Sequence, residues 1–134
     1  TPCGTLFPYT TLFRSGVNNG VIVDIDLHFG DGTSGFYSAK EAVSYYHLDG
    51  QSGLETFLSS VQACDLVGIS AGFDRHLEDW GGTLSTEDYR SIGQTIRAFT
   101  QKHCPGRVFA LLEGGYNHTI LGEAILALLE GLEP

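Results

Sequence analysis

The sequence is poor in basic residues and in cysteine, and each shortage excludes a class of protein. Seven Lys and Arg stand against 16 Asp and Glu, which gives a net charge of −9 with His neutral. Attraction to nucleic acid or to an anionic membrane surface needs clustered Lys and Arg, so we expect neither partner. The three cysteines, Cys3, Cys64 and Cys104, are far apart in sequence and outside any Cys-x-x-Cys spacing. This excludes a disulfide framework and a thiolate zinc knuckle, and we expect a reducing, cytoplasmic location.

The sequence also lacks a long apolar run and a recognisable leader. Its longest apolar stretches fall well short of the roughly 18 residues that a membrane-spanning helix needs. No charged segment precedes an apolar segment with a cleavage site, so we expect no membrane partner. With 134 residues, 42% of them hydrophobic, the chain has enough apolar material for the core of one domain.

The amino-terminal residues do not read as natural protein sequence. Thr5 to Ser15 match, codon for codon, one reading frame of a common sequencing-adapter oligonucleotide. We therefore interpret residues 1–15 as artefactual and exclude them from the fold. We expect residues 16–134 to be the carboxyl-terminal part of a larger domain whose amino-terminal part is missing.

The rest of the sequence alternates short β-rich apolar runs with segments of helical period. This alternation predicts an α/β fold with a mostly parallel sheet flanked by helices. The expected strands are residues 21–26, 42–47, 66–70 and 107–112, and residues 30–35 are expected to form a glycine-rich loop. One helix is expected over 53–64, a second after a capping box formed by Ser85 and Asp88, and a third capped by Asn117.

Polar residues follow three of the expected strands. Asp26 ends the first and His28 follows it, Asp74 follows the strand over 66–70, and Tyr116 follows the last. In open parallel sheets, ligands bind outside the carboxyl ends of the strands, so we expect these loops to converge. Side chains at i and i+2 of a strand share a face, which lets an Asp-x-His pair hold one cation. Asp74 would complete three ligands and leave a position for water, as in a catalytic site for Zn²⁺ or another divalent transition metal.

The Asp-x-His pair and Asp74 each have a simpler explanation than metal binding. The Asp-x-His pair is also compatible with a surface turn, and Asp74 with a helix cap or an ordinary loop carboxylate. Carboxylates that follow an Ile-rich and Val-rich strand are costly to bury unless they are paired or bound to a metal, which favours a site.

Three motifs carry a resemblance to a known family. Val23 to Thr33 (VDIDLHFGDGT), Ser70 to His76 (SAGFDRH) and Leu112 to Asn117 (LEGGYN) occur in the order found in the histone deacetylase family, which includes acetylpolyamine amidohydrolases. The likeness extends from Val21 to the carboxyl end. It implies part of an arginase/deacetylase fold that removes acetyl groups from an acetyl-lysine protein or an acetylated small molecule such as a polyamine.

The resemblance also assigns roles to individual residues. It implies that Asp26, His28 and Asp74 bind one Zn²⁺, and that Tyr116 donates a hydrogen bond to the substrate carbonyl and its tetrahedral oxyanion. It further implies a monovalent cation such as K⁺, held by Asp24 and by the backbone around Asp26 and His28.

The sequence departs from the family in three places. Phe29 replaces a second His that is not a zinc ligand, and the stretch between His28 and Asp74 is short, which should remove part of the rim of the site. Asp24 and Asp31 match carboxylates that orient an adjacent His-His pair, the general base and acid of the family, but no His-His occurs in this sequence. We therefore expect the isolated chain to be inactive and marginally folded, because elements that should cover the first strand are absent.

Two alternatives remain open. A binuclear manganese ureohydrolase of the arginase type would use a similar fold, but that chemistry needs additional bridging aspartates. The other alternative is a non-catalytic fragment that acts as a binding module.

Overall fold

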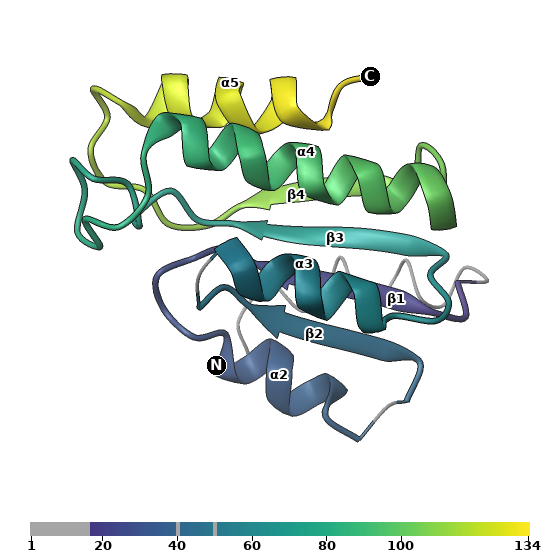
Figure 1. Ribbon diagram of the computed structural model, residues 1–134. Coiled ribbons are helices and arrows are strands. Elements are labelled where there is room, and N and C mark those ends of the chain that lie inside the picture. The colour runs from purple at the N-terminus through teal and green to yellow at the C-terminus, as the bar shows by residue number, and fades with distance from the viewer. Residues whose placement is uncertain (1–16, 40, 50) are drawn as a thin grey trace.

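The computed structural model describes residues 17–134 except residues 40 and 50, and the adapter-like residues 1–15 lie outside the described part. Within this described part, four parallel strands form a sheet in the order β2-β1-β3-β4 (Figure 1). This confirms the predicted α/β class and the parallel sheet. The strands are β1 (Gly20–Asp24), β2 (Val43–His47), β3 (Leu66–Ala71) and β4 (Val108–Leu112).

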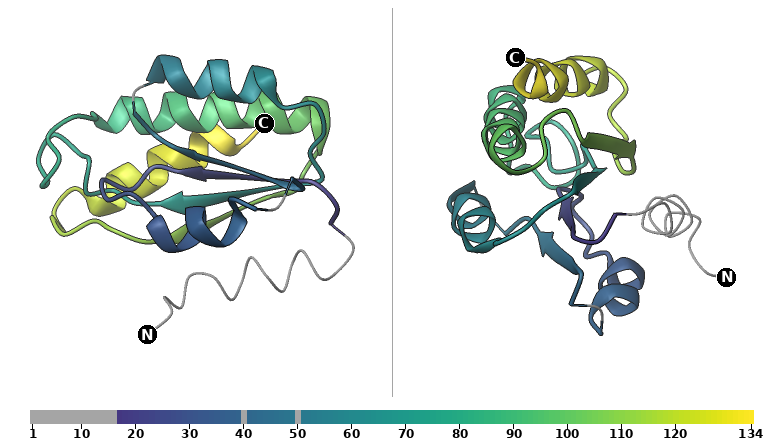
Figure 2. Two further views of the ribbon diagram at one scale, coloured as in Figure 1. Left: turned by 90° about the horizontal axis from the view of Figure 1, so that it is seen from below. Right: turned by 90° about the vertical axis from the view of Figure 1, so that its right-hand side faces the viewer.

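Among the described residues, four helices flank this sheet, with helices on both of its faces. Figure 2 shows α3 and α4 on one side of the sheet and α2 on the other, while α5 packs along α4. The helices are α2 (Asp31–Tyr37), α3 (Gln51–Ser60), α4 (Thr86–His103) and α5 (Leu121–Leu132). No helix in the part of the chain that the structure describes combines the length and the apolar character needed to cross a membrane.

The alternation of side chains along β1 divides the core into two layers. Val21 and Val23 point into the larger apolar cluster, which they share with buried residues of α3, α4 and α5. Ile22 points to the opposite face and packs with Tyr37 of α2. This alternation is the expected consequence of a strand with helices on both sides.

The expectation that the first strand would lack cover is wrong. All five residues of β1 are buried, because β2 and β3 pair with its two edges and helices cover its faces. The edges of this sheet are instead β2 and β4, and Leu112 at the end of β4 is 61% exposed.

Residues 30–35 do not form the predicted loop, because α2 begins at Asp31. Gly32 and Gly35 lie within α2 and Gly30 directly precedes it, and glycine disfavours a helix by propensity. Thr33 and Tyr37 are nevertheless buried along one side of α2. Tertiary burial therefore decides the conformation of this segment.

The boundaries of the other helices follow the prediction unevenly. The capping box is confirmed, since Ser85 and Asp88 bond reciprocally at the start of α4. α3 ends at Ser60, four residues early, and the Sγ of Cys64 instead lies 3.6 Å from the Sγ of Cys104, both as free thiols. α5 begins at Leu121 rather than after Asn117, whose side-chain oxygen accepts a hydrogen bond from the backbone of Thr119. Asn117 therefore caps a turn that precedes the helix.

Candidate metal centre

The loops after β1, β3 and β4 meet at the carboxyl edge of the sheet, on the left in Figure 1. The predicted convergence is confirmed, because the three strands are neighbours and run parallel. Asp26 and His28 follow β1, Asp74 follows β3, and Tyr116 follows β4.

Asp26, His28 and Asp74 form a compact group of candidate ligands. One side-chain atom of each lies within 4.8 Å of those of the other two. The Nδ1 of His28 is 3.2 Å from Oδ1 of Asp26 and 3.1 Å from Oδ2 of Asp74. Asp74 is fully buried, Asp26 is largely buried, and the His28 side chain is 60% exposed. The group is thus closed on the protein side and open toward solvent at the imidazole.

The local structure that brings Asp26 and His28 together differs from the prediction. β1 ends at Asp24, so the pair does not share the face of a strand. The chain instead bends, because carboxylates accept the backbone N–H groups of this loop. Oδ1 of Asp24 accepts from Asp26, Oδ1 of Asp26 accepts from His28, and Oδ1 of Asp74 accepts from Leu27. The first two bonds are Asx turns, a short-range property of Asp that the strand period does not capture, and the third is a contact between distant segments.

The carboxylate of Asp74 is buried without full compensation. Its Oδ2 makes no hydrogen bond, although its Oδ1 accepts from the N–H of Leu27 at 2.9 Å. Burial raises the pKa of Asp74 above its ordinary value, the charge of Asp26 adds to this, and the Leu27 N–H and His28 oppose it. A buried carboxylate oxygen without a donor is costly unless a cation binds it.

These three side chains fit a zinc ion. Zn²⁺ binds nitrogen and oxygen ligands at about 2.0–2.2 Å in tetrahedral geometry, which separates neighbouring ligand atoms by roughly 3.3 Å. The separations of 3.1 and 3.2 Å from His28 Nδ1 are close to this value. Gly114 also contributes, since its N–H donates to Oδ2 of Asp26 at 2.9 Å, and a Cβ at this position would lie 2.5 Å from that oxygen.

Two of the candidate ligands, Asp26 and His28, border a cavity of about 420 Å³, and Asp74 is buried behind them. Asp24, Asp26, His28, Asp31 and Tyr116 all line it, which brings the remaining predicted site residues to one place. Glu113 also lines it, and burial followed by the charges of Asp26 and Asp24 raises its pKa.

The two carboxylates predicted to orient a His pair differ in their surroundings. Asp31 is exposed at the start of α2, and its Oδ1 accepts the N–H of Gly32. Asp24 is buried and already has partners in this chain. Its Oδ2 accepts from the hydroxyl of Tyr45 at 2.5 Å and lies 3.4 Å from Nδ1 of His47.

The carboxylate of Asp79 connects the loop after β3 to the loop that carries Tyr116. Oδ2 of Asp79 accepts the backbone N–H groups of Tyr116 and Asn117, each at 2.8 Å, and its Oδ1 accepts that of Trp80 at 2.7 Å. The Trp80 ring stacks on the Tyr116 ring at a centroid distance of 4.2 Å. Tyr116 is therefore held through both its backbone and its ring.

Comparison with known proteins agrees with the family that the three sequence motifs resemble. The sequence profile of the histone deacetylase domain matches residues 51–132. The chain belongs to the histone deacetylase family. It is 33% identical over 96 residues to type-2 histone deacetylase 1 of Dictyostelium discoideum, which covers 63% of this chain and 6% of that protein. It is 28% identical to a probable deacetylase of Archaeoglobus fulgidus, over 89% of this chain and 32% of that protein.

A solved structure supports the fold of this histone deacetylase family member. The crystal structure of the HDA15 HD domain superposes with a TM-score of 0.78 at 21% identity, covering 96% of this chain and 48% of that one. The predicted arginase/deacetylase fold is thereby confirmed. The chain spans less than half the length of each of these relatives.

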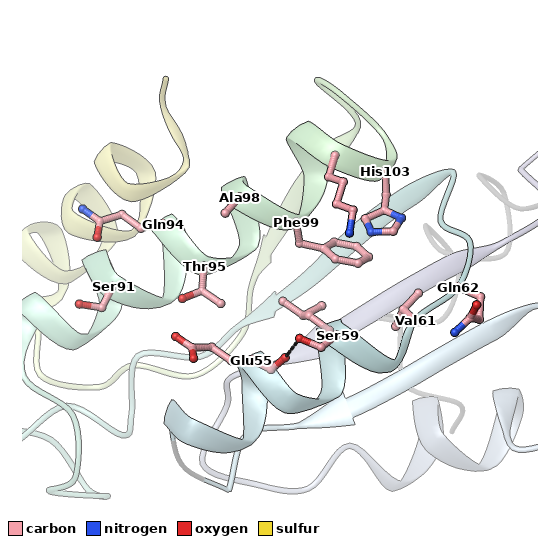
Figure 3. A pocket seen from close by; sticks show the side chains of 12 residues that line it. Glu55, Ser59, Val61, Gln62, Ser91, Gln94, Thr95, Ala98, Phe99 and His103 are labelled. Carbon is pink, nitrogen blue, oxygen red and sulfur yellow. Dashed lines mark hydrogen bonds between the residues drawn. The ribbon is translucent and has the colours of Figure 1, made fainter.

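A larger cavity in the described part of the chain lies away from the candidate metal ligands. This groove between α3 and α4 has a volume of about 860 Å³. Mainly polar side chains line it, among them Glu55, Gln94 and His103 (Figure 3). None of the candidate ligands borders this groove. Size alone therefore does not locate the chemistry of this chain.

Sequence reasoning missed several residues of the site. Asp79 and Trp80 follow the SAGFDRH motif, and Trp80 is the only tryptophan of the chain, but neither occupies a periodic or metal-ligand spacing. Tyr45 and His47 belong to β2, and only the parallel pairing of β2 with β1 brings them to Asp24. Of these residues, only Trp80 stood out in the composition, as the single tryptophan of the sequence. In the structure its side chain is 70% exposed.

Replacing Asp79 with Asn is expected to release the Tyr116 loop. Burial would raise the pKa of Asp79, but the N–H donors of Asn117, Trp80 and Tyr116 outweigh it and hold the pKa below its ordinary value. The carboxylate therefore stays charged at neutral pH, and its contribution is lost only when the pH falls through this lowered pKa. Asn keeps one acceptor and turns an N–H₂ group toward a donor. Because hydrogen bonds to a charged group contribute about 1.5–3 kcal/mol, amide exchange at residues 116 and 117 should rise roughly tenfold or more.

Hydrogen exchange and the emission of Trp80 would measure this release. The matched control is Glu78→Gln, because Asn117 bonds to the backbone oxygen of Glu78 and not to its carboxylate. Equal exchange rates at Tyr116 and Asn117 in the Asp79→Asn variant and the parent chain would show that Asp79 does not hold this loop.

Proposed function

We propose that this chain is part of a zinc-dependent amidohydrolase that removes acetyl groups from acetyl-lysine or acetylated polyamines. Asp26, Nδ1 of His28 and Asp74 would hold one metal ion. The observation that carries the proposal is the fully buried Asp74, whose Oδ2 lacks a hydrogen bond and lies 3.1 Å from His28 Nδ1. Membership of the histone deacetylase family supports the hydrolase class.

Tyr116 would act on the substrate carbonyl. When bound, zinc supplies Lewis acidity toward the amide carbonyl. Burial, followed by the charges of Asp74 and Asp26, raises the pKa of the Tyr116 phenol, so it stays protonated at neutral pH. A protonated phenol donates a hydrogen bond to the oxygen that becomes negative as the carbonyl is attacked. Its attachment to Asp79 and Trp80 would keep this donor in place.

General acid and base catalysis is the part of the reaction for which this sequence offers no His-His pair. In the family that pair transfers the protons, and Asp24 and Asp31 occupy the positions that would orient it. Loss of a positioned acid or base costs on the order of 10²–10⁴ in rate. We therefore expect the isolated chain to hydrolyse an acetyl-lysine peptide or an acetylated polyamine very slowly, and rates comparable to those of complete enzymes would contradict this.

A single metal is favoured over the manganese pair of the arginase alternative. Within the described residues, Asp26, His28 and Asp74 are the one group of three with ligand atoms close enough for a metal. A binuclear site needs further bridging carboxylates. One zinc per chain is the outcome expected, whereas two manganese ions per chain would support the ureohydrolase.

Zinc titration of the metal-free chain tests the proposal. Calorimetry should give one site, and zinc at about 100 times its dissociation constant should stabilise the fold by about 2.7 kcal/mol. His28→Ala should abolish both effects. His118→Ala is the matched control, because His118 lies outside the candidate group. Unchanged zinc binding by the His28→Ala variant would refute the assignment and leave the non-catalytic alternative.

A further inference from the structure

Arg75 connects two parts of the site that the proposed function does not use. Its Nε donates to the backbone oxygen of Asp26 at 3.0 Å, and its Nη2 lies 2.9 Å from Nε2 of His47. A guanidinium is planar, is charged at any physiological pH and can only donate hydrogen bonds. One fixed positive charge therefore contacts both the loop that carries Asp26 and the end of β2.

The contact with Arg75 fixes the protonation pattern of His47. Because the guanidinium donates, Nε2 of His47 must accept, and the ring proton lies on Nδ1. That Nδ1 is 3.4 Å from Oδ2 of Asp24. The same Oδ2 accepts a hydrogen bond from the hydroxyl of Tyr45. Oδ1 of Asp24 in turn accepts the N–H of Asp26 at 3.0 Å. Hydrogen bonds thus join Arg75 to His47 and to Asp26, and Asp26 to Asp24, in one network. Nδ1 of His47 lies near Asp24 without a hydrogen bond.

This network conflicts with the monovalent cation that the family resemblance implies. The expected ligands were Asp24 and the backbone around Asp26 and His28. The backbone oxygen of Asp26 already accepts a hydrogen bond from the guanidinium of Arg75, and the backbone oxygen of Asp24 accepts one from the N–H of Leu48 at 2.8 Å. A second positive charge within a few ångströms of Arg75 would be repelled. These residues do not fit a monovalent cation.

We propose that Arg75 is a built-in cation, a positioning residue whose guanidinium holds the Asp26 loop and makes the fold independent of K⁺ and Na⁺. The positive charge of Arg75 suits its surroundings, because three carboxylates lie at this edge of the sheet, those of Asp24, Asp26 and Asp74. A covalently attached cation also needs no ion to be captured from solution. Only the zinc arm of the test below rests on the proposed function.

Thermal unfolding in different salts tests the proposal. At matched ionic strength, the parent chain should have the same melting temperature in KCl, NaCl and tetramethylammonium chloride, the last of which is too large to enter such a site. Arg75→Met should lower the melting temperature and create a rise that is specific to K⁺ or Na⁺, because a free ion can then reach the Asp26 carbonyl. Arg75→Lys keeps the charge and should fold with intermediate stability. Arg107→Met, at an exposed arginine before β4, is the matched control.

Specific outcomes would overturn the proposal. Saturable stabilisation of the parent chain by K⁺ over tetramethylammonium would reveal an ion site beside Arg75. A melting temperature of Arg75→Met equal to the parent's would remove the positioning role, and a loss that K⁺ does not restore would reduce Arg75 to a packing residue. If Arg75→Met does not fold, Arg75→Lys and the salt independence of the parent chain still decide.

The zinc arm separates this inference from the proposed function. Zinc affinity of the parent chain should not change with K⁺, and Arg75→Met should weaken it by about 10–100-fold, as expected for a partner that holds a ligand in place. If the parent chain binds no zinc, the proposed function fails, while the melting temperatures still test Arg75. Zinc affinity of Arg75→Met equal to that of the parent would contradict the positioning role.

Discussion

Replacing Asp74 with Asn is expected to abolish zinc binding and to leave the metal-free protein at least as stable as the parent. Asp74 is the one fully buried member of the candidate ligand group. Loss of an outer partner of a metal ligand costs about 10–100-fold in affinity, so loss of a ligand should exceed roughly 100-fold. Asn keeps an oxygen that can accept from Leu27, as Oδ1 does now.

The stability of the Asp74→Asn variant should follow the sign of the pKa shift. Burial raises the pKa of Asp74 above its ordinary value of 3.8, so the folded chain holds a proton that the unfolded chain has released. The free energy of unfolding of the metal-free parent therefore falls as the pH rises from that value through the raised pKa. The variant lacks this fall, because Asn does not titrate.

Calorimetric zinc titration and thermal unfolding across this pH range would measure both effects. Asp31→Asn is the matched control, since Asp31 is an exposed carboxylate of the same cavity outside the ligand group. A variant that lost zinc binding together with much of its metal-free stability would show that Asp74 is a structural carboxylate. Retained zinc binding would remove it from the ligand set.

Adding one methyl group at Gly93 is expected to destabilise the fold by about 2–3 kcal/mol, near the upper end for overpacking. Gly93 faces α5 from α4, and a Cβ there would lie 2.5 Å from the backbone oxygen of Leu128 and 3.0 Å from Cα of Gly131. Both neighbours are backbone atoms, so α4 and α5 must move apart. These two helices make the most extensive contact between any two elements in the described part of the chain, so their separation should be felt by the whole fold.

The same substitution at Gly122 is the matched control for Gly93→Ala. Gly122 lies in α5, and a Cβ added there would have nothing within 4 Å, so alanine meets no obstacle. It should raise stability by up to about 1 kcal/mol through helix propensity. Denaturant unfolding of both variants would measure the difference, and a loss at Gly93 no larger than the change at Gly122 would contradict the close contact of the helices.

The regular elements of the fold were largely predictable, because their signals are short-range. The strands around Val21 and Val67 and the capping box at Ser85 were read from runs and spacings that act over a few residues. α2 was not predictable in this way. Its glycines disfavour a helix locally, and the burial of Tyr37 against Ile22 is a contact between segments distant in sequence.

For the site, the amino-acid sequence was enough to identify the candidates for chemistry, since Asp26, His28, Asp74 and Tyr116 each follow an apolar run in a recognisable motif. What surrounds these residues depends on the folded chain. Strand pairing sets His47 beside Asp24, and the loop after β3 turns Arg75 toward the backbone of Asp26. The physical reason is that motifs record local chemistry, whereas the charge that balances a buried carboxylate comes from whichever segment the packing of the sheet brings within a few ångströms.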